Sequence, residues 1–275
     1  MHSWKAMTAF LAVANQKGGV AKTTNTINTA GALSERGHKV LAVDADPQGY
    51  LSRLLGFTSA YNTDETNLTT AFKEPNQHDL SELVYEHAEF DVVPSSIEMF
   101  MLQQELIASG WKPRERLSML FDNLEGTAYD FIVVDAPPSL GVINDNVLLA
   151  CRTMLLPVEA DGTSVHALDI LLNQIETLEE RYSVQITQVA VIISNINYPL
   201  DNEQREMIEY FEETFEGRCP VHQVRHRAAI KRSLGAGGSI FGENAEETDM
   251  TDNYLALAEG LGRSMEVTAN VQRNR

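Results

Sequence analysis

Two lysines five residues apart stand at the ends of a glycine-rich segment that follows an apolar run near the N-terminus. The segment reads Lys17-Gly18-Gly19-Val20-Ala21-Lys22-Thr23-Thr24. Small residues let backbone N–H groups turn inward around an anion, and a helix that starts here adds the positive end of its dipole. Lys22 would reach the β- and γ-phosphates of a nucleotide, and the Thr23 hydroxyl could ligate Mg²⁺. A glycine-rich turn alone accounts for the glycines but not for Lys-Thr-Thr, so the pattern predicts a phosphate-binding loop.

Acidic side chains follow two later apolar runs. Asp44 and Asp46 come after the second run, which Pro47 ends, and Asp135 directly follows the run 131–134. Open α/β sheets bind ligands at the carboxyl ends of their strands, so we expect these carboxylates to face the phosphates. There a carboxylate can hold a metal-bound water or orient the attacking one. Paired aspartates after a strand are also common turn formers, and the pattern alone leaves that alternative open.

Short apolar or β-branched runs alternate with longer segments of helical spacing. The runs are 10–14, 40–43, 90–93, 131–134, 154–158 and 189–193, and the helical segments are 23–36, 96–109, 113–124, 164–181, 202–215 and 251–265. This alternation predicts an α/β fold with a doubly wound, mostly parallel sheet and helices on both faces, and together with the phosphate-binding loop it predicts P-loop NTPase architecture. No repeat or long linker divides the sequence, so we expect residues 1–275 to form a single domain.

The composition excludes several classes of protein. With 39 acidic against 21 basic residues the net charge is −18, which opposes nonspecific nucleic-acid binding through overall charge. Only seven of the basic residues are lysines; this favours a halophilic source, with an ordinary acidic surface as the alternative. The sequence contains no run of 18 apolar residues, so it predicts no transmembrane span. Cys151 and Cys219 are too far apart for a CxxC motif, so we expect reduced thiols in a cytoplasmic protein.

Lys17 is unusual, because phosphate loops of this type ordinarily begin with glycine. With this residue the loop resembles the ParA/MinD family of deviant Walker-type ATPases, in which the extra lysine crosses a dimer interface to the partner's nucleotide. The segment after the second run, with Asp44 and Asp46, resembles the family's switch, and Pro137-Pro138 after Asp135 resembles its second switch. The resemblance implies an ATP-dependent sandwich homodimer in which Lys17 acts in trans.

The same resemblance assigns the cofactors, the reaction and the site residues. It implies ATP and Mg²⁺ as cofactors and hydrolysis of ATP to ADP and phosphate. Catalytic roles fall to Lys17, Lys22 and Asp46, and the Mg²⁺ shell falls to Thr23, Asp44 and Asp135. The nucleotide-binding residues are Lys17, Gly18, Gly19, Val20, Ala21, Lys22, Thr23, Thr24 and Asn195. Asn195 follows the run 189–193, where some family members use Asn against adenine, although Asn at a strand end is usually only part of a turn.

The resemblance weakens near residues 221–230. Family members commonly carry a Pro-Arg-Asn-like element there that helps to hold the base, whereas this chain reads Val224-Arg225-His226-Arg227. The sequence therefore does not identify which residues of this region contact the base. Four cations fall within eight residues of this region, which is an exception in so acidic a chain: Arg225, Arg227, Lys231 and Arg232. A short helix there would resemble the region where partition ATPases bind double-stranded DNA without sequence preference. Ion pairing with the acidic surface is the alternative.

Three functional classes of the family compete: partition ATPases that bind DNA, MinD-like regulators that bind membrane, and iron–sulfur or nitrogenase-type relatives. The third class needs clustered cysteines, which this sequence lacks. A MinD-like regulator would bind membrane through a terminal amphipathic helix, but residues 264–275 offer only Met265, Val267 and Val271 as apolar anchors. Sixteen residues precede the loop, and we expect these to be too few for an N-terminal helix-turn-helix. We therefore expect a ParA-like (Soj-like), nucleoid-associated ATPase for plasmid partition, chromosome segregation or cargo positioning, stimulated by a ParB-like protein, with the MinD-like regulator as the alternative.

Overall fold

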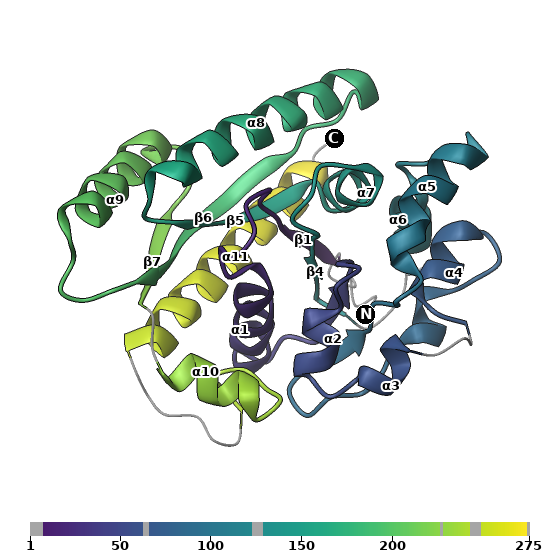
Figure 1. Ribbon diagram of the computed structural model, residues 1–275, viewed down its shortest axis with the longest axis horizontal. Helices are drawn as coiled ribbons and strands as arrows, with labels where there is room; N and C mark the ends of the chain where they lie inside the picture. The colour runs from purple at the N-terminus through teal and green to yellow at the C-terminus, as the bar shows by residue number, and fades with distance from the viewer. Residues whose placement is uncertain (1–7, 63–65, 123–128, 226–227, 243–248, 274–275) are drawn as a thin grey trace.

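In the part of the chain that the structure describes, seven parallel strands form one sheet in the order β3-β2-β4-β1-β5-β6-β7 (Figure 1). The computed structural model describes residues 8–62, 66–122, 129–225, 228–242 and 249–273, with the backbone alone from residue 264. The strands are β1 Ala9–Val13, β2 Val40–Asp44, β3 Asp91–Val93, β4 Phe131–Asp135, β5 Thr153–Glu159, β6 Thr187–Ile196 and β7 Val221–Arg225. This confirms the predicted α/β class.

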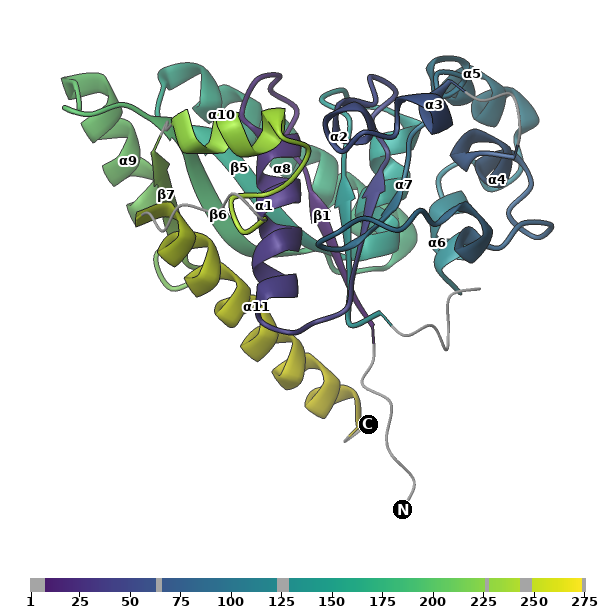
Figure 2. The ribbon, with the colours of Figure 1, turned by 90° about the horizontal axis from the view of Figure 1, so that it is seen from below.

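Helices cover both faces of the sheet (Figures 1 and 2). One face carries α1 Lys22–Glu35, α2 Tyr50–Leu54, α10 Ala228–Gly235 and α11 Asp249–Arg273. The other carries α4 Leu68–Lys73, α5 Met99–Ser109, α6 Arg116–Asp122, α7 Val142–Cys151, α8 Gly162–Tyr182 and α9 Asn202–Phe215. The short α3 Thr58–Tyr61 and a 3₁₀ turn at Leu80–Leu83 lie between β2 and β3.

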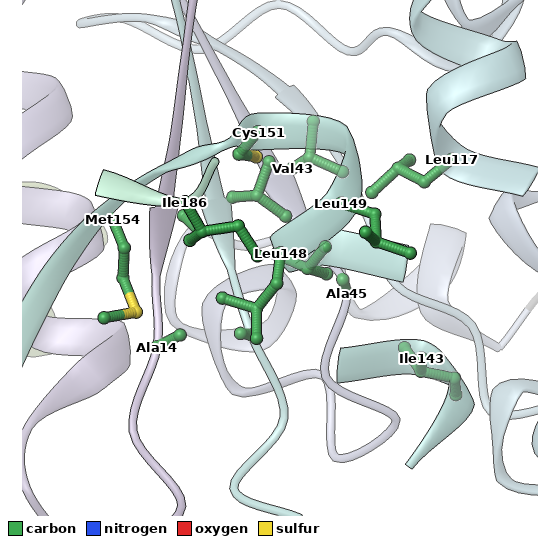
Figure 3. Packing of buried hydrophobic residues seen from close by; sticks show 14 of the residues in the cluster. Ala14, Val43, Ala45, Leu117, Ile143, Leu148, Leu149, Cys151, Met154 and Ile186 are labelled. Carbon is green, nitrogen blue, oxygen red and sulfur yellow. The ribbon is translucent and has the colours of Figure 1, made fainter. Parts of the chain in front are cut away.

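The two faces of the sheet enclose two separate apolar cores, and β4 contributes to both. Ile132 and Val134 point into the core under α4 to α9, while Phe131 and Val133 point into the core under α1 and α11. This alternation follows from the two-residue period of a strand, and a strand buried on both faces must be apolar throughout. Figure 3 shows part of the first core, where Leu148 and Leu149 of α7 pack near Val43 of β2.

The predicted elements agree with the structure where their sequence is strongly patterned. All six predicted runs are strands, and α9 has the predicted bounds 202–215. The prediction missed β7 because its sequence, VHQVR, is largely polar at the edge of the sheet. It also missed α7, and α11 is longer than predicted. In the part of the chain that the structure describes, no helix is both long and apolar enough to cross a membrane.

Candidate nucleotide site

The loop between β1 and α1 curves around an open space. Gly19 and Ala21 have φ values of +82° and +62°, which turn the chain sharply before the helix starts. A Cβ atom added at Gly18 or Gly19 would meet no other atom within 4 Å. Ala21, the N-cap residue of α1, makes no side-chain capping hydrogen bond, so the first N–H groups of the helix stay available to an anion. This geometry fits the triphosphate of a nucleotide.

Lys22 lies at the base of this loop and is only 8% exposed. Its Nζ donates to the carbonyl oxygen of Lys17 at 3.1 Å. Burial lowers the pKa of Lys22, while the nearby Asp135 and Asp46 carboxylates act in the opposite direction. A buried ammonium that donates to a neutral carbonyl is a strong site for an additional anion, such as a phosphate.

Asp44 and Asp135 end two neighbouring strands and are register partners in the sheet. The Thr23 hydroxyl donates to one oxygen of Asp135 at 2.6 Å, and Thr26 donates to the other at 3.2 Å. Burial raises the pKa of Asp135 well above its usual range, and the Asp44 charge adds to this effect. The structure thus brings the three predicted Mg²⁺ residues to one edge.

Thr23, Asp44 and Asp135 are better suited to Mg²⁺, which also takes waters and phosphates as ligands, than to a metal ion that is bound by protein side chains alone. Among the described residues no group of three or more His, Cys, Asp or Glu side chains is arranged to hold a metal ion. Mg²⁺ is commonly bound through one or two carboxylates together with waters and substrate phosphates. A hydroxyl and two carboxylates beside a phosphate loop match that donor set.

Asp44 is completely buried, and its carboxylate accepts hydrogen bonds from Ser52 of α2 and from the backbone of Asp46. One carboxylate oxygen accepts from the Ser52 N–H at 2.8 Å and from the Ser52 hydroxyl at 2.6 Å, and the other accepts from the Asp46 N–H at 3.2 Å. Burial raises the pKa of Asp44 to about 7, although the bonds from Ser52 lower it. The Asp44 carboxyl therefore has a pKa close to neutral pH.

Asp46 lies close to Lys22 and is 7% exposed. Its carboxylate accepts from the Gln48 N–H at 2.9 Å, and its backbone carbonyl accepts from the Ser95 hydroxyl at 2.7 Å. Burial raises the pKa of Asp46, while the Gln48 bond and the Lys22 charge lower it. A carboxylate with a raised pKa is a better proton acceptor, which suits a group that orients a water molecule.

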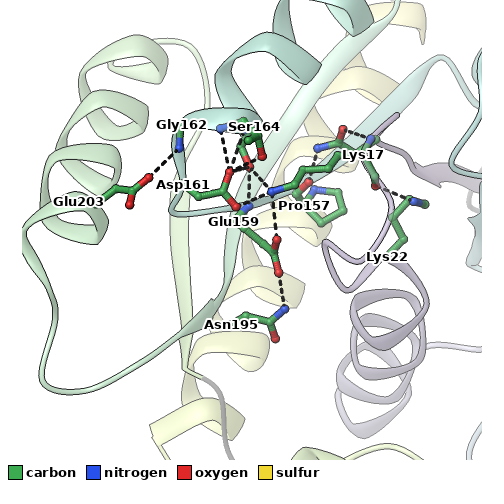
Figure 4. Close-up of polar contacts among 11 residues, drawn as sticks. Lys17, Lys22, Pro157, Glu159, Asp161, Gly162, Ser164, Asn195 and Glu203 are labelled. Carbon is green, nitrogen blue, oxygen red and sulfur yellow. Dashed lines mark hydrogen bonds and ion pairs between the residues drawn. The ribbon is translucent and has the colours of Figure 1, made fainter.

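Lys17 extends from the loop toward β5 and α8 (Figure 4). Its Nζ donates to Glu159 at 3.1 Å, to Asp161 through a short hydrogen bond, and to the Ser164 hydroxyl at 3.3 Å. Burial acts to lower the pKa of Lys17, but the bonds to Asp161 and Glu159 raise it. Burial likewise acts to raise the pKa of Asp161, yet the bonds from Lys17 and Thr163 lower it to about 2.

A cavity of about 200 Å³ adjoins the phosphate loop beside α1. Asn195, Arg225 and Lys231 line it together with apolar side chains such as Ile230 and Leu234. Asn195 has φ +59°, and its side-chain amide donates to Glu159 at 2.7 Å. A cavity with this mixture of apolar walls and polar groups, next to a phosphate site, fits a nucleobase.

The predicted cationic cluster is divided between this cavity and the surface. Arg225 is half-buried at the end of β7, with its guanidinium 3.9 Å from the centre of the Tyr198 ring. Lys231 and Arg232 are exposed on α10, and Lys231 also lines the cavity. Arg227 lies outside the described residues.

Glu159 and Asp161 are functional candidates that the sequence analysis missed. They close β5 as Glu-Ala-Asp, the same acid-alanine-acid pattern that Asp44 and Asp46 form after β2. Asn15 was missed as well: its side chain bridges the loop to β5 by donating to the Pro157 carbonyl at 2.6 Å and accepting from the Lys17 N–H at 3.0 Å. The acid-alanine-acid pattern, repeated at the end of an apolar run, was the signal that could have identified Glu159 and Asp161.

Comparisons with known proteins agree with this geometry. A family model described as an AAA domain matches residues 8–189. An uncharacterized protein of Mycobacterium tuberculosis is 31% identical over 206 residues, covering 74% of this chain and 63% of that protein, so the match spans less than two thirds of its length. The chromosome partitioning protein ParA of Myxococcus xanthus is 29% identical over 197 residues, covering 70% of this chain and 66% of its own. Among solved structures, an ATP complex of a Cyanothece McdA variant superposes with a TM-score of 0.79 at 22% identity, covering 93% of this chain and 96% of that one, which is a likeness of fold.

The raised pKa of Asp44 makes a prediction about pH in the nucleotide-free protein. A carboxyl whose pKa rises from 3.8 to about 7 on folding stabilises the protein fully below pH 4, and this contribution is lost as the pH rises to about 7. The expected slope is up to about 1.4 kcal/mol per pH unit for this one proton. Carbon-13 NMR of the Asp44 carboxyl should show titration near pH 7, whereas Asp161 should stay ionised from pH 4 to 9. An Asp44 already ionised at pH 5 would contradict this account.

Proposed function

The chain belongs to the ParA/MinD family of deviant Walker-type ATPases, and from that premise we propose that it hydrolyses ATP to ADP and phosphate. The observation that carries the proposal is the pair of lysines at one phosphate loop, with Lys22 buried among carboxylates and Lys17 at the loop's outer edge. ATP in the superposed Cyanothece complex is consistent with this choice of nucleotide. We further propose that residues 1–275 work as a single domain.

In the proposed site the loop residues 17–24 hold the phosphates through their backbone N–H groups and Lys22. Thr23, Asp44 and Asp135 would hold Mg²⁺, which when bound supplies positive charge against the phosphate oxygens. Asn195 and the cavity beside it would take the base. Each of these groups comes from the carboxyl end of a strand or from the helix that follows one.

Asp46 is proposed to orient the water that attacks the terminal phosphate and to accept its proton. The water oxygen forms the new bond to phosphorus, the bond to the ADP oxygen breaks, and phosphate leaves. Two features support this role: the carboxylate lies close enough to Lys22 to feel its charge, and burial makes it a better base.

Lys17 is proposed to act in trans, on the nucleotide of a second copy in a sandwich homodimer. Its side chain is 20% exposed at the rim of the loop rather than buried beneath it. An ammonium at the rim can meet a phosphate from outside its own subunit, which Lys22 cannot do from its buried position.

The biological role that we propose is partition of plasmid or chromosomal DNA, or positioning of another cargo. The support is the family, the similarity to a chromosome partitioning ParA, and the cations at the end of β7 and on α10. The ATP-bound dimer would bind double-stranded DNA without sequence preference, associate with the nucleoid in the cytoplasm, and be released when a ParB-like partner stimulates hydrolysis. A MinD-like membrane-associated regulator is the alternative from the same family.

Replacing Asp46 tests the chemistry. Asp46→Ala should lower ATP hydrolysis by at least about 100-fold, because general-base catalysis contributes this much, and should leave ATP binding intact. Lys22→Ala should instead lose nucleotide binding itself. The measurements are steady-state phosphate release and fluorescent-nucleotide titration, with Asp252→Ala on the exposed side of α11 as a control. Hydrolysis by Asp46→Ala at the parental rate would mean that another group orients the water.

Reversing the charge of Arg232 tests the DNA role without altering a residue that lines the cavity. Arg232→Glu, alone and with Arg227→Glu, should weaken ATP-dependent binding to every duplex and reduce the log–log salt slope by about 0.9 per lost phosphate contact. ATP hydrolysis without DNA should stay at the parental level.

Arg218→Glu is the matched control, because it makes the same charge change at an exposed residue outside the cluster. A salt titration of duplex binding, with ATP present, gives the measurement. If the parental protein binds no DNA at any salt concentration where it is folded, but binds liposomes, the MinD-like alternative takes the place of the partition role.

A further inference from the structure

Three deeply buried polar side chains line the cavity beside the phosphate loop, and each comes from a different element. They are Asn25 of α1, Ser194 of β6 and Tyr254 of α11, which are 0%, 3% and 1% exposed. The helices α1 and α11 pack together on one face of the sheet (Figures 1 and 2). A polar group buried this deeply is costly unless protein, water or a ligand completes its hydrogen bonds.

A fourth side chain, Asn28 of α1, starts a chain of hydrogen bonds whose direction is fixed by the backbone. Its Oδ1 accepts from the Ile240 N–H at 2.9 Å, and its Nδ2 donates to the Thr24 carbonyl at 2.8 Å. A backbone N–H can only donate and a carbonyl can only accept, so the Asn28 amide cannot be reversed. Burial raises the pKa of Tyr254, and a side-chain hydrogen bond from Asn28 acts to lower it. Asn28 is therefore a donor to the Tyr254 hydroxyl oxygen.

The chain continues in the same direction from Tyr254 to Ser194. The Tyr254 hydroxyl donates to Asn25 Oδ1 at 2.6 Å, and Asn25 Nδ2 donates to the Ser194 hydroxyl oxygen at 2.9 Å. A serine hydroxyl that accepts a bond still has one proton to donate. Among the residues that the structure describes, none accepts this proton. The chain thus ends in a buried O–H donor at the cavity wall.

A purine base has the groups that this donor lacks. The ring nitrogens N1, N3 and N7 of adenine carry no proton and accept hydrogen bonds, and the flat ring suits the apolar side chains of Ile230 and Leu234 in the same cavity. A buried donor without a partner costs free energy, and a ring nitrogen that accepts from Ser194 would remove that cost.

We propose that Ser194 is a specificity-determining residue that donates a hydrogen bond to a ring nitrogen of the bound base. Asn28, Tyr254 and Asn25 are positioning residues that keep the Ser194 proton directed into the cavity. The inference rests on the proposed binding of ATP at this site, and it adds a base contact that is separate from Asn195.

Ser194→Ala removes the donor and leaves the cavity otherwise unchanged. It should weaken ATP binding by about 10-fold, the effect of one buried hydrogen bond. The matched control is Thr69→Val, because Thr69 on α4 is another buried hydroxyl without a partner but lies on the other face of the sheet. Thr69→Val should bind ATP as the parental protein does. The measurement is equilibrium competition against a fluorescent nucleotide.

Analogues that lack one ring nitrogen distinguish a direct contact with the base from a change in folding. The probes are 1-deaza-, 3-deaza- and 7-deaza-ATP, in which a C–H group replaces one acceptor. One of them should bind the parental protein about 10-fold more weakly than ATP, and this difference should fall below about twofold in Ser194→Ala. A loss of stability would not remove the difference for one analogue alone.

Tyr254→Phe tests the positioning residues and serves as the second variant if Ser194→Ala fails to fold. Without the Tyr254 hydroxyl, the Asn25 amide can turn its Oδ1 toward Ser194 and take up the proton. Tyr254→Phe should therefore weaken ATP binding several-fold and reduce the difference for the same analogue. Tyr129→Phe is the matched control, because it also removes a tyrosine hydroxyl that donates at 2.6 Å, here to Asp91.

The outcomes separate this inference from the proposed function. A parental protein that binds no ATP would refute the proposed function, and the inference with it. If the parental protein binds ATP, equal affinity in Ser194→Ala would overturn the contact, as would differences among the analogues that are unchanged in that variant. Parental affinity in Tyr254→Phe would overturn the positioning role.

Discussion

Asp44 and Asp135 are register partners at the carboxyl ends of adjacent parallel strands, so their carboxylates cannot separate unless the sheet itself unpairs. The same sheet places the loop after β1 between β4 and β5. Lys22 then lies within the field of Asp46 and Asp135, and Lys17 meets the acidic end of β5. Two-sided burial of β4 in apolar cores keeps this arrangement in place. The chemistry of the site is therefore a consequence of strand register, and the loops supply the remaining geometry.

Burial of charged groups gives the nucleotide-free site an electrostatic cost. The pKa values of Asp44, Asp46 and Asp135 are all raised by burial, and the pKa of Lys22 is lowered by burial. Each shift disfavours the charged form, so added groups of opposite charge would stabilise the site. A triphosphate would supply negative charge to the lysines, and Mg²⁺ would supply positive charge to the carboxylates. We infer that binding of the two together relieves a cost that the fold imposes.

Much of this could be predicted because the decisive signals are local in sequence. Lys17-Gly18-Gly19 and Lys22 carry their chemistry within six residues, and the strongly apolar runs identify six of the strands. The contacts of Lys17 could not be predicted, because Glu159 and Asp161 are 142 and 144 residues away and meet it only through the pairing of β1 with β5. β7 was missed because an edge strand need not be apolar, and without it Lys231 could not be placed at the cavity.

The measurement that tests the central claim most directly is the mass of the protein in solution with a nonhydrolysable ATP analogue, for the parental chain and for Lys17→Ala. The parental mass should double from 30.5 kDa, while Lys17→Ala should bind the analogue with similar affinity and stay at 30.5 kDa. This outcome would separate the two lysines of the loop, one for binding within the subunit and one for action between subunits. A Lys17→Ala protein that dimerises at the parental analogue concentration would contradict the account.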